Sequence, residues 1–227
     1  MTSSAPTMTA AVVTSPGKLE LTQALIPEPG PGQVRVKLEG CGVCASNLPP
    51  WQGREWFTYP FAPGQLGHES WGRVDAVGPD ARSFAVGQRV AMLSNHAYAQ
   101  YDVADEGSVV ALPPSLDNQP FPAEPLGCAM NIFARSDIKP GQTVAIVGIG
   151  FLGAILTRLA THAGAKVIAI ARRPYAMDVA TRMGAAHSIA MDDHWQIIEK
   201  VKAITSEQFC DVVIECVGKQ WPLDLSA

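Results

Sequence analysis

A glycine-rich turn in the second half of the chain limits the folds that this sequence can adopt. Residues 143–147 form a continuous apolar run, typical of a buried parallel strand, and residues 151–163 follow as a predicted helix. The turn between them reads Gly148-Ile149-Gly150-Phe151-Leu152-Gly153. The first glycine permits a tight turn, the second lets a pyrophosphate approach the backbone, and the third lets helix and strand pack closely. A plain strand-to-helix turn is the alternative, but the context favours a dinucleotide site formed by Gly148, Gly150, Phe151, Leu152 and Gly153.

Strands and helices continue to alternate beyond this turn. Further strands are expected at residues 166–170, 188–190 and 212–216. Helices are expected at residues 175–183, with Pro174 near the start, and at residues 195–204. Because strands joined by helical crossovers form a parallel sheet, the second half is predicted to be part of a Rossmann domain, a doubly wound α/β fold.

The end of the second strand bears on the choice of cofactor. A carboxylate at this point commonly binds the ribose hydroxyls of NAD, but here the sequence reads Ala171-Arg172-Arg173. Ala171 leaves room for a 2′-phosphate, and Arg172 and Arg173 offer planar charged donors. One charge-assisted hydrogen bond contributes about 1.5 to 3 kcal/mol, or about ten- to a hundredfold in affinity. We therefore expect NADP(H) to be preferred, with NAD(H) possible if the arginines are merely solvated. Val217, after the last strand, is a further expected cofactor contact.

The first half of the chain has a different pattern. Turns rich in Pro and Gly separate short runs that resemble strands, at residues 10–13, 33–38, 72–77, 88–92 and 99–103. This pattern predicts a mostly β domain. A proline-rich passage from Leu112 to Pro125 marks the boundary. We divide the chain into a catalytic domain at residues 1–122 and an incomplete nucleotide-binding domain at residues 123–227.

Three separate segments carry side chains that suit a divalent metal. They read Cys41-Gly42-Val43-Cys44, Gly67-His68-Glu69 and Glu124-Pro125-Leu126-Gly127-Cys128. A catalytic zinc needs three protein ligands and an open position, and thiolate, imidazole and carboxylate groups all suit it. Cys41 and Cys44 could instead form a redox pair or half of a structural zinc site, but the chain has no second close pair of cysteines.

The segment Gly67-His68-Glu69-Ser70-Trp71-Gly72, with Gly78 downstream, resembles the signature of the zinc-containing alcohol dehydrogenase family, which belongs to the medium-chain dehydrogenases. The similarity extends from Val34-Arg35-Val36 to the run Asp211-Val212-Val213-Ile214-Glu215-Cys216. The resemblance implies a GroES-like catalytic domain followed by a Rossmann domain. It also implies reversible hydride transfer between a zinc-bound alcohol and a nicotinamide.

The resemblance assigns roles to the metal-binding segments. Cys44 and His68 correspond to the first two zinc ligands, and Glu69 to a carboxylate that can enter or leave the metal shell. Glu124 opens a Glu-Pro-Leu segment, as does the third ligand in the polyol (sorbitol) dehydrogenase branch, and Cys128 is the alternative. A single, catalytic zinc is expected, because the four-cysteine cluster of the family's structural-zinc lobe is absent.

The residues after the first ligand include two departures from the family pattern. Ser46 corresponds to the hydroxyl that takes the proton from the alcohol. Asn47 stands where an Asp usually supports the ligand histidine, and this is expected to weaken metal affinity or ligand basicity. Pro49 replaces a relay histidine that some members carry. Trp51 is a candidate wall of the substrate pocket, although core packing would explain it equally well.

These observations predict a zinc-dependent oxidoreductase that acts on an alcohol, a polyol or a hydroxy amino acid such as threonine. A zinc-free quinone reductase would have no use for Cys44, His68 and Glu69 together. Complete family members continue beyond the fourth strand to finish a larger sheet, so we expect a C-terminally truncated member with an exposed apolar sheet edge. The alternative is a catalytically inactive fragment that binds nucleotide or associates with a full-length relative. A homo-oligomer is expected for a full-length form.

Composition excludes other classes of protein. A net charge of −4, with Lys and Arg scattered along the chain, gives no footprint for nucleic acid. Residues 1–11 lack the pattern of a secretory signal, and the longest apolar stretch, residues 144–156, contains three glycines and is too short to span a membrane. The five cysteines do not suggest a disulfide framework. We therefore expect a cytoplasmic protein whose partner is a small molecule.

Overall fold

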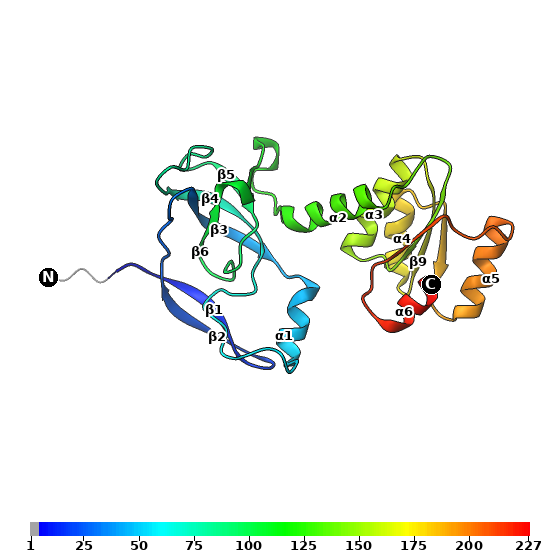
Figure 1. Cartoon of the computed structure of the whole chain (residues 1–227), viewed down its shortest axis with the longest axis horizontal. Helices are drawn as coiled ribbons and strands as arrows, with labels where there is room; N and C mark the ends of the chain where they lie inside the picture. Colours follow the sequence, from blue (N-terminus) through cyan, green and yellow to red (C-terminus); the bar gives the residue numbers. More distant parts are fainter. Residues whose placement is uncertain (1–4) are drawn as a thin grey trace. The chain divides into compact units, whose positions relative to one another are not determined.

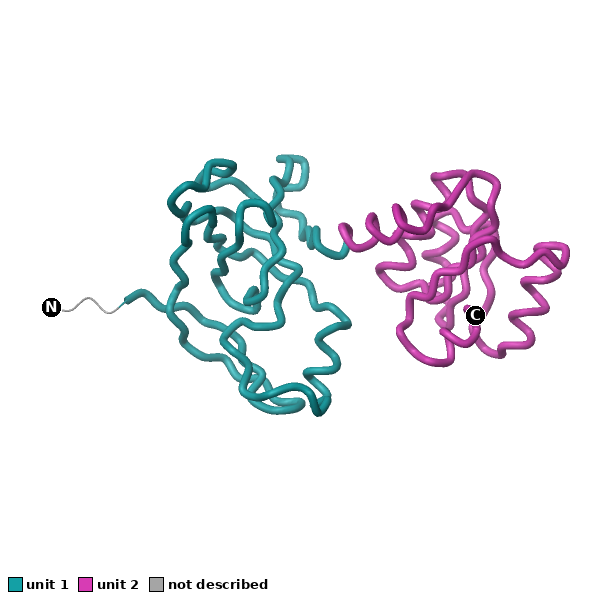
Figure 2. Tube along the Cα trace, viewed as in Figure 1, with its two compact units in different colours: residues 1–125 teal, residues 126–227 magenta. Residues whose placement is uncertain are grey.

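The computed structural model describes residues 5–227 and divides them into two compact units. The first unit extends to Pro125 and the second begins at Leu126, as the two colours of Figure 2 show.

The first unit is built from antiparallel strands (Figure 1). Its larger sheet has five strands in the order β6-β3-β4-β5-β7. These strands are β3 (Gln33–Gly42), β4 (Glu69–Val77), β5 (Arg89–Met92), β6 (Tyr101–Asp105) and β7 (Val109–Ala111). Val34, Val36, Val74 and Val90 are at most 2% exposed and form the centre of the core. Because alternate residues of a strand face the same side, this valine pattern fixes which face of the sheet is buried.

A separate hairpin and two short helical segments complete the ordered elements that bear on the site. The hairpin pairs β1 (Thr7–Ser15) with β2 (Lys18–Leu25). A 3-10 turn, η1 (Ala45–Asn47), leads into the short helix α1 (Leu48–Gln52), which ends at Gly53 in the left-handed region. Two more 3-10 turns, η2 (Glu106–Ser108) and η3 (Pro114–Leu116), follow β6 and β7.

The sequence predicted five strands in this half, and all five are confirmed. β2 and the three-residue β7 were missed. The first half of β2 alternates between polar and apolar residues. Leu19, Leu21 and Leu25 on this strand are 49%, 72% and 67% exposed, so the apolar side of β2 is not part of the core. Alternation of apolar and polar residues usually indicates a strand with one face buried in the core, but on β2 the apolar face is exposed.

The second unit contains a four-stranded parallel sheet with the strand order β10-β9-β8-β11. The strands are β8 (Thr143–Val147), β9 (Lys166–Ala171), β10 (His187–Ala190) and β11 (Val212–Glu215). α2 (Ala123–Arg135) begins in the first unit and continues into the second. The other helices of the second unit are α3 (Phe151–His162), α4 (Pro174–Met183), α5 (His194–Thr205) and α6 (Gln220–Ser226). This arrangement confirms the predicted fold class, a mostly β domain followed by a Rossmann-like parallel sheet. β11 forms one edge of the sheet, and Val213 on it is 41% exposed.

Local sequence explains where the crossover helices begin and end. Pro174 occupies the first turn of α4, where its missing N–H breaks no bond, and Gly184 with φ +102° ends that helix. Asp193 caps α5, because its Oδ1 accepts a hydrogen bond from the backbone N of Gln196 at 2.9 Å. Among the helices of residues 5–227, none combines the length and the apolar character that crossing a membrane requires.

Candidate metal and nucleotide sites

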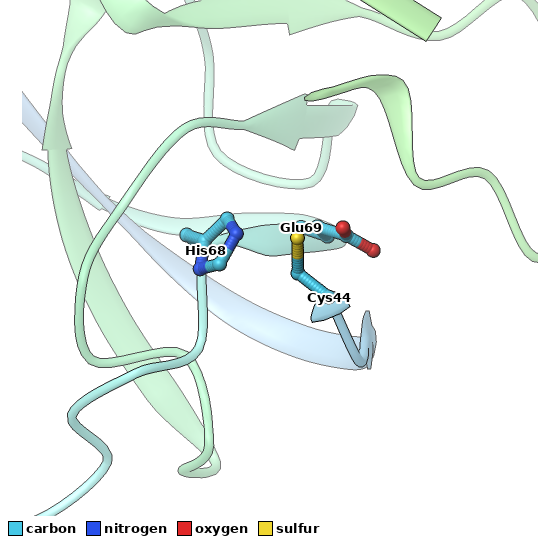
Figure 3. Close-up of side chains that lie close together, drawn as sticks. All are labelled: Cys44, His68 and Glu69. Carbon is cyan, nitrogen blue, oxygen red and sulfur yellow. The ribbon is translucent and has the colours of Figure 1, made fainter. Parts of the chain in front are cut away.

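Cys44, His68 and Glu69 lie together in the first unit. Their ligand atoms, one sulfur, one ring nitrogen and one carboxylate oxygen, are all within 4.8 Å of one another. Figure 3 shows the three side chains gathered at one place, with Cys44 on the segment after β3 and the other two at the start of β4.

Strand pairing explains why residues so distant in sequence meet. β3 and β4 are antiparallel, and their register pairs Gly42 with Glu69 at the end where β3 finishes and β4 begins. Cys44 follows this pair by two residues and His68 precedes it by one. The pairing of β3 with β4 therefore brings together the two ends of the connection between these strands. Cys44 lies near its first end and His68 at its last.

Two glycines of the motifs are required by packing. A Cβ on Gly42 would lie 2.0 Å from Oε2 of Glu69, and a Cβ on Gly67 would lie 2.4 Å from the backbone N of Tyr98. Gly67 therefore admits the loop that carries Ala97 and Tyr98, whose backbone N–H groups donate to Gly67 and Gly64. These close approaches give a physical reason for the glycine on each side of the candidate ligands.

The donor set fits a divalent ion of intermediate softness. Glu69 is 7% exposed, and an isolated buried carboxylate is costly unless a positive group offsets it. A thiolate, an imidazole and a carboxylate whose ligand atoms lie within 4.8 Å of one another are a donor set that suits zinc. Burial raises the pKa of the Cys41 thiol to about 11, and its Sγ donates to the Gly42 carbonyl at 3.3 Å. Cys41 is therefore a neutral packing residue beside the cluster and not a member of it.

A hydrogen-bonded chain connects His68 with two residues outside the cluster. Nδ1 of His68 lies 2.9 Å from the carbonyl oxygen of Leu66, and Nδ2 of Asn47 donates to the same oxygen at 3.0 Å. The Tyr98 hydroxyl donates to Oδ1 of Asn47 at 2.9 Å. Burial, followed by nearby negative charge, raises the pKa of Tyr98 to about 12, so this hydroxyl keeps its proton. The sequence singled out Asn47 but not Leu66 or Tyr98.

The other predicted site residues of this region lie outside the cluster. Glu124 is in the first turn of α2, and Cys128 lies one turn further along the same helix. Neither belongs to the three-residue cluster found among residues 5–227, so the third fixed ligand stays a prediction. Ser46 is exposed in η1, two residues after Cys44, and Trp51 in α1 is 41% exposed.

A cavity of about 530 Å³ opens in the second unit at the carboxyl ends of the parallel strands. Segments that follow all four strands contribute to its wall. The lining includes Gly148 and Gly150 after β8, Arg172 and Arg173 after β9, Met191 and Asp192 after β10, and Cys216 and Val217 after β11. Ligands of doubly wound sheets bind in this crevice, and the predicted cofactor residue Val217 is part of it.

The three glycines of the turn meet different steric demands. Gly148 has φ +98°, and a Cβ there would lie 2.4 Å from a methyl group of Val217. A Cβ on Gly153 would lie 2.0 Å from the Gly148 carbonyl oxygen. Gly150 has no neighbouring atom within 4 Å of its Cβ position, so the protein itself does not require glycine there. Gly150 precedes α3 without a side-chain cap, which leaves the helix N–H groups for an anion.

The charge of the cavity wall is mainly positive. Arg172, Arg173 and Lys219 line it, against the single carboxylate of Asp192. In the part of the chain that the structure describes, no ion pair involves Arg172 or Arg173. Both guanidinium groups are exposed, which favours a phosphate-bearing ligand. The sequence analysis did not include Lys219 among the cofactor-binding residues. Its position just after the last strand, two residues beyond Val217, could have indicated it.

Both halves of the chain resemble domains of known dehydrogenases. Residues 30–114 match the model of the alcohol dehydrogenase GroES-like domain, and residues 152–226 match the model of zinc-binding dehydrogenases. The chain is 27% identical to the sorbitol dehydrogenase of Bacillus subtilis (strain 168), over 93% of this chain and 69% of the relative. It is 32% identical to an alcohol dehydrogenase of Rhizobium meliloti (strain 1021), over 79% of this chain and 62% of the relative.

Solved structures share the fold. The mycobacterial protein Rv1454c complexed with NADPH is 28% identical with a TM-score of 0.83, covering 96% of this chain and 69% of that one. Other solved neighbours are quinone oxidoreductases, one mycobacterial and one from Pseudomonas syringae pv. Tomato DC3000. The chain thus spans about two-thirds of the length of the proteins it matches.

Proposed function

Because this chain belongs to the zinc-containing alcohol dehydrogenase family, we propose that it takes part in NADP-dependent oxidation of an alcohol at a single zinc site. The observation that carries the proposal is the approach of the Cys44, His68 and Glu69 ligand atoms to within 4.8 Å of one another. We assign this chemistry to a catalytic domain at residues 1–122 and cofactor binding to residues 123–227.

Cys44, His68 and Glu69 would hold the zinc, with Glu124 as the third fixed ligand and Glu69 as the carboxylate that can leave. When bound, zinc supplies Lewis-acid polarisation of the alcohol oxygen and the nicotinamide supplies the acceptor for the hydride. Ser46, exposed in η1 two residues after Cys44, would take the alcohol proton. Pro49 leaves no relay histidine at its position, so the Ser46 hydroxyl would release its own proton toward the cofactor ribose or water as it accepts that of the alcohol.

For the cofactor, we propose NADP(H) over NAD(H). The N-terminus of α3 at Gly150, Phe151 and Leu152 would bind the pyrophosphate, and Gly150 has the open space that a close approach needs. Arg172 and Arg173 would bind the 2′-phosphate. The excess of cationic side chains in the cavity wall supports this preference.

For the substrate class, we propose a polyol or a hydroxy amino acid. Glu124-Pro125-Leu126 follows the pattern of the polyol branch, in which a carboxylate replaces the third cysteine ligand. The similarity to a sorbitol dehydrogenase over 93% of this chain is in line with that branch.

The test measures zinc content and NADP+ reduction by the purified 227-residue chain with sorbitol, threonine and simple alcohols. We expect one zinc per chain and activity that Cys44→Ser and His68→Ala both abolish. One zinc and NADPH binding without turnover would contradict the proposed activity and support a binding role. A chain that binds no zinc would contradict the proposed metal site.

A further inference from the structure

The backbone carbonyl of Leu66 receives two hydrogen bonds that tie a candidate metal ligand to its surroundings. One comes from Nδ2 of Asn47 at 3.0 Å, and the other joins Nδ1 of His68 at 2.9 Å. A carbonyl oxygen can only accept, so the proton of the His68 ring must be on Nδ1. Nε2 then presents its lone pair, which is the state that a metal requires.

The Leu66 carbonyl fixes the orientation of the Asn47 amide, because a carbonyl can only accept, and a second partner then faces the amide oxygen. The Tyr98 hydroxyl donates to Oδ1 of Asn47 at 2.9 Å, and the Gly42 carbonyl is a second, more distant acceptor at 3.3 Å. The amide therefore has a donor facing its oxygen and an acceptor facing its nitrogen, and only one orientation satisfies both. The backbone N of Asn47 also donates to the Cys44 carbonyl at 3.1 Å. One residue thus contacts the turn of one candidate ligand and the hydrogen-bond partner of another.

The backbone conformation of Leu66 indicates that surrounding contacts hold this carbonyl in place. Leu66 has φ +84°, in the left-handed region that a leucine rarely adopts. Such a conformation persists only where surrounding contacts hold it. The bonds from Asn47 and His68 are two such contacts, and both end on the Leu66 carbonyl oxygen.

We propose that Asn47 is a positioning residue for His68, acting through the Leu66 carbonyl, and that Tyr98 holds the Asn47 amide in place through its oxygen. This inference rests on the proposed metal site. The zinc-containing family usually has an Asp at this position, but a carboxylate here would place a second acceptor against the Leu66 oxygen with no proton between them. Restoring that Asp should therefore weaken the metal site of this chain.

The first test measures zinc affinity by competition with a chromophoric chelator. We expect Asn47→Asp to weaken zinc binding about 10- to 100-fold, the range seen when a partner of a ligand histidine is lost. Tyr98→Phe should weaken it about 2- to 10-fold, because the amide oxygen loses its hydrogen bond while the bond to the Leu66 carbonyl remains. Asn118→Asp and Tyr101→Phe are the matched controls at positions outside the chain of bonds, and neither should change zinc affinity.

Coupling between the two residues separates positioning from general damage. In an Asn47→Ala background, Tyr98→Phe should cause a smaller loss than in the unchanged protein, because the amide that it contacts is gone and only its bond to the Gly42 carbonyl is left to lose. Additive losses would overturn the role of Tyr98. Asn47→Asp binding zinc as tightly as the unchanged protein, or more tightly, would overturn the role of Asn47.

A measurement on the metal-free, unchanged protein needs no variant to fold. Nitrogen-15 chemical shifts of the His68 ring at pH 8 report which nitrogen carries the proton. We expect the proton on Nδ1, and a proton on Nε2 would overturn the inference. If the unchanged chain binds no zinc but shows the Nδ1 proton, the proposed metal site fails while the hydrogen-bonded chain stands.

Discussion

Gly42 and Glu69 are paired across β3 and β4, and a Cβ on Gly42 would lie 2.0 Å from Oε2 of Glu69. The Glu69 carboxylate therefore lies over the backbone of β3, in space that exists only because residue 42 has no side chain. The same carboxylate is 7% exposed and lies beside Cys44 and His68. One missing methyl group thus allows a buried acid to reach the candidate metal position.

Gly42→Ala should accordingly displace the Glu69 carboxylate. We expect zinc affinity to fall about tenfold or more, with a loss of about 1–3 kcal/mol in the free energy of unfolding from overpacking. Chelator competition and urea unfolding measure the two effects. Gly107→Ala is the control, since a Cβ there meets nothing within 4 Å. Zinc affinity that is unchanged in Gly42→Ala would contradict a role for Glu69 at the metal.

Substitutions of two glycines in the nucleotide turn should have separate effects, one on NADPH binding and the other on the stability of the fold. Gly150→Ala places a methyl group in open space, so we expect a stability change below about 1 kcal/mol. NADPH affinity should nevertheless fall about ten- to a hundredfold as the pyrophosphate is displaced. Gly153→Ala should instead destabilise the fold by about 1–3 kcal/mol, because its Cβ would lie 2.0 Å from the Gly148 carbonyl. Thermal unfolding and NADPH fluorescence titration distinguish the two. Equal NADPH affinity in Gly150→Ala would argue against a pyrophosphate at this turn.

Arg172 and Arg173 should determine the preference between cofactors. We expect replacing both with Ala to weaken NADPH about ten- to a hundredfold, because charge-assisted bonds to the 2′-phosphate are lost, while NADH affinity stays nearly constant. Arg158→Ala, an exposed arginine on α3 that does not line the cavity, is the control. If both cofactors lose affinity equally, the arginines do not read the 2′-phosphate.

The parallel sheet was predictable because its signals are local. The buried runs of β8 and β9, and the glycine turn between β8 and α3, lie within short stretches of sequence. The meeting of Cys44 with His68 was less accessible, since it depends on the register that pairs Gly42 with Glu69. The strand predicted from the sequence began at Gly72, whereas β4 begins at Glu69, so the prediction did not include that pair.

The contacts of Leu66 could not be predicted from sequence. Its left-handed backbone is unusual for leucine, and nothing in the residue type announces it. Tyr98 reaches Asn47 only because Gly67 admits the loop of Ala97 and Tyr98. Asn47 was expected to weaken the site because a carboxylate was assumed to be the better partner. The contacts in the structure give the amide a specific set of bonds instead.

Alkylation should distinguish Cys44 from Cys41. The thiolate is the reacting form, and burial raises the pKa of Cys41 to about 11, so at pH 8 only about one thiol in a thousand is ionised. We expect zinc to protect Cys44 from iodoacetamide and Cys41 to react slowly with or without zinc. Mass spectrometry of the peptides measures both. Protection of Cys41 in place of Cys44 would reverse the assignment of the ligand.

X-ray absorption at the zinc edge, on the chain loaded with one equivalent of zinc, tests the central claim most directly. We predict one sulfur at about 2.3 Å from Cys44 and nitrogen and oxygen ligands at about 2.0–2.2 Å from His68 and the carboxylates. A second sulfur would replace Glu124 with Cys128 as the third fixed ligand. A spectrum with no sulfur shell would contradict a metal site built on Cys44.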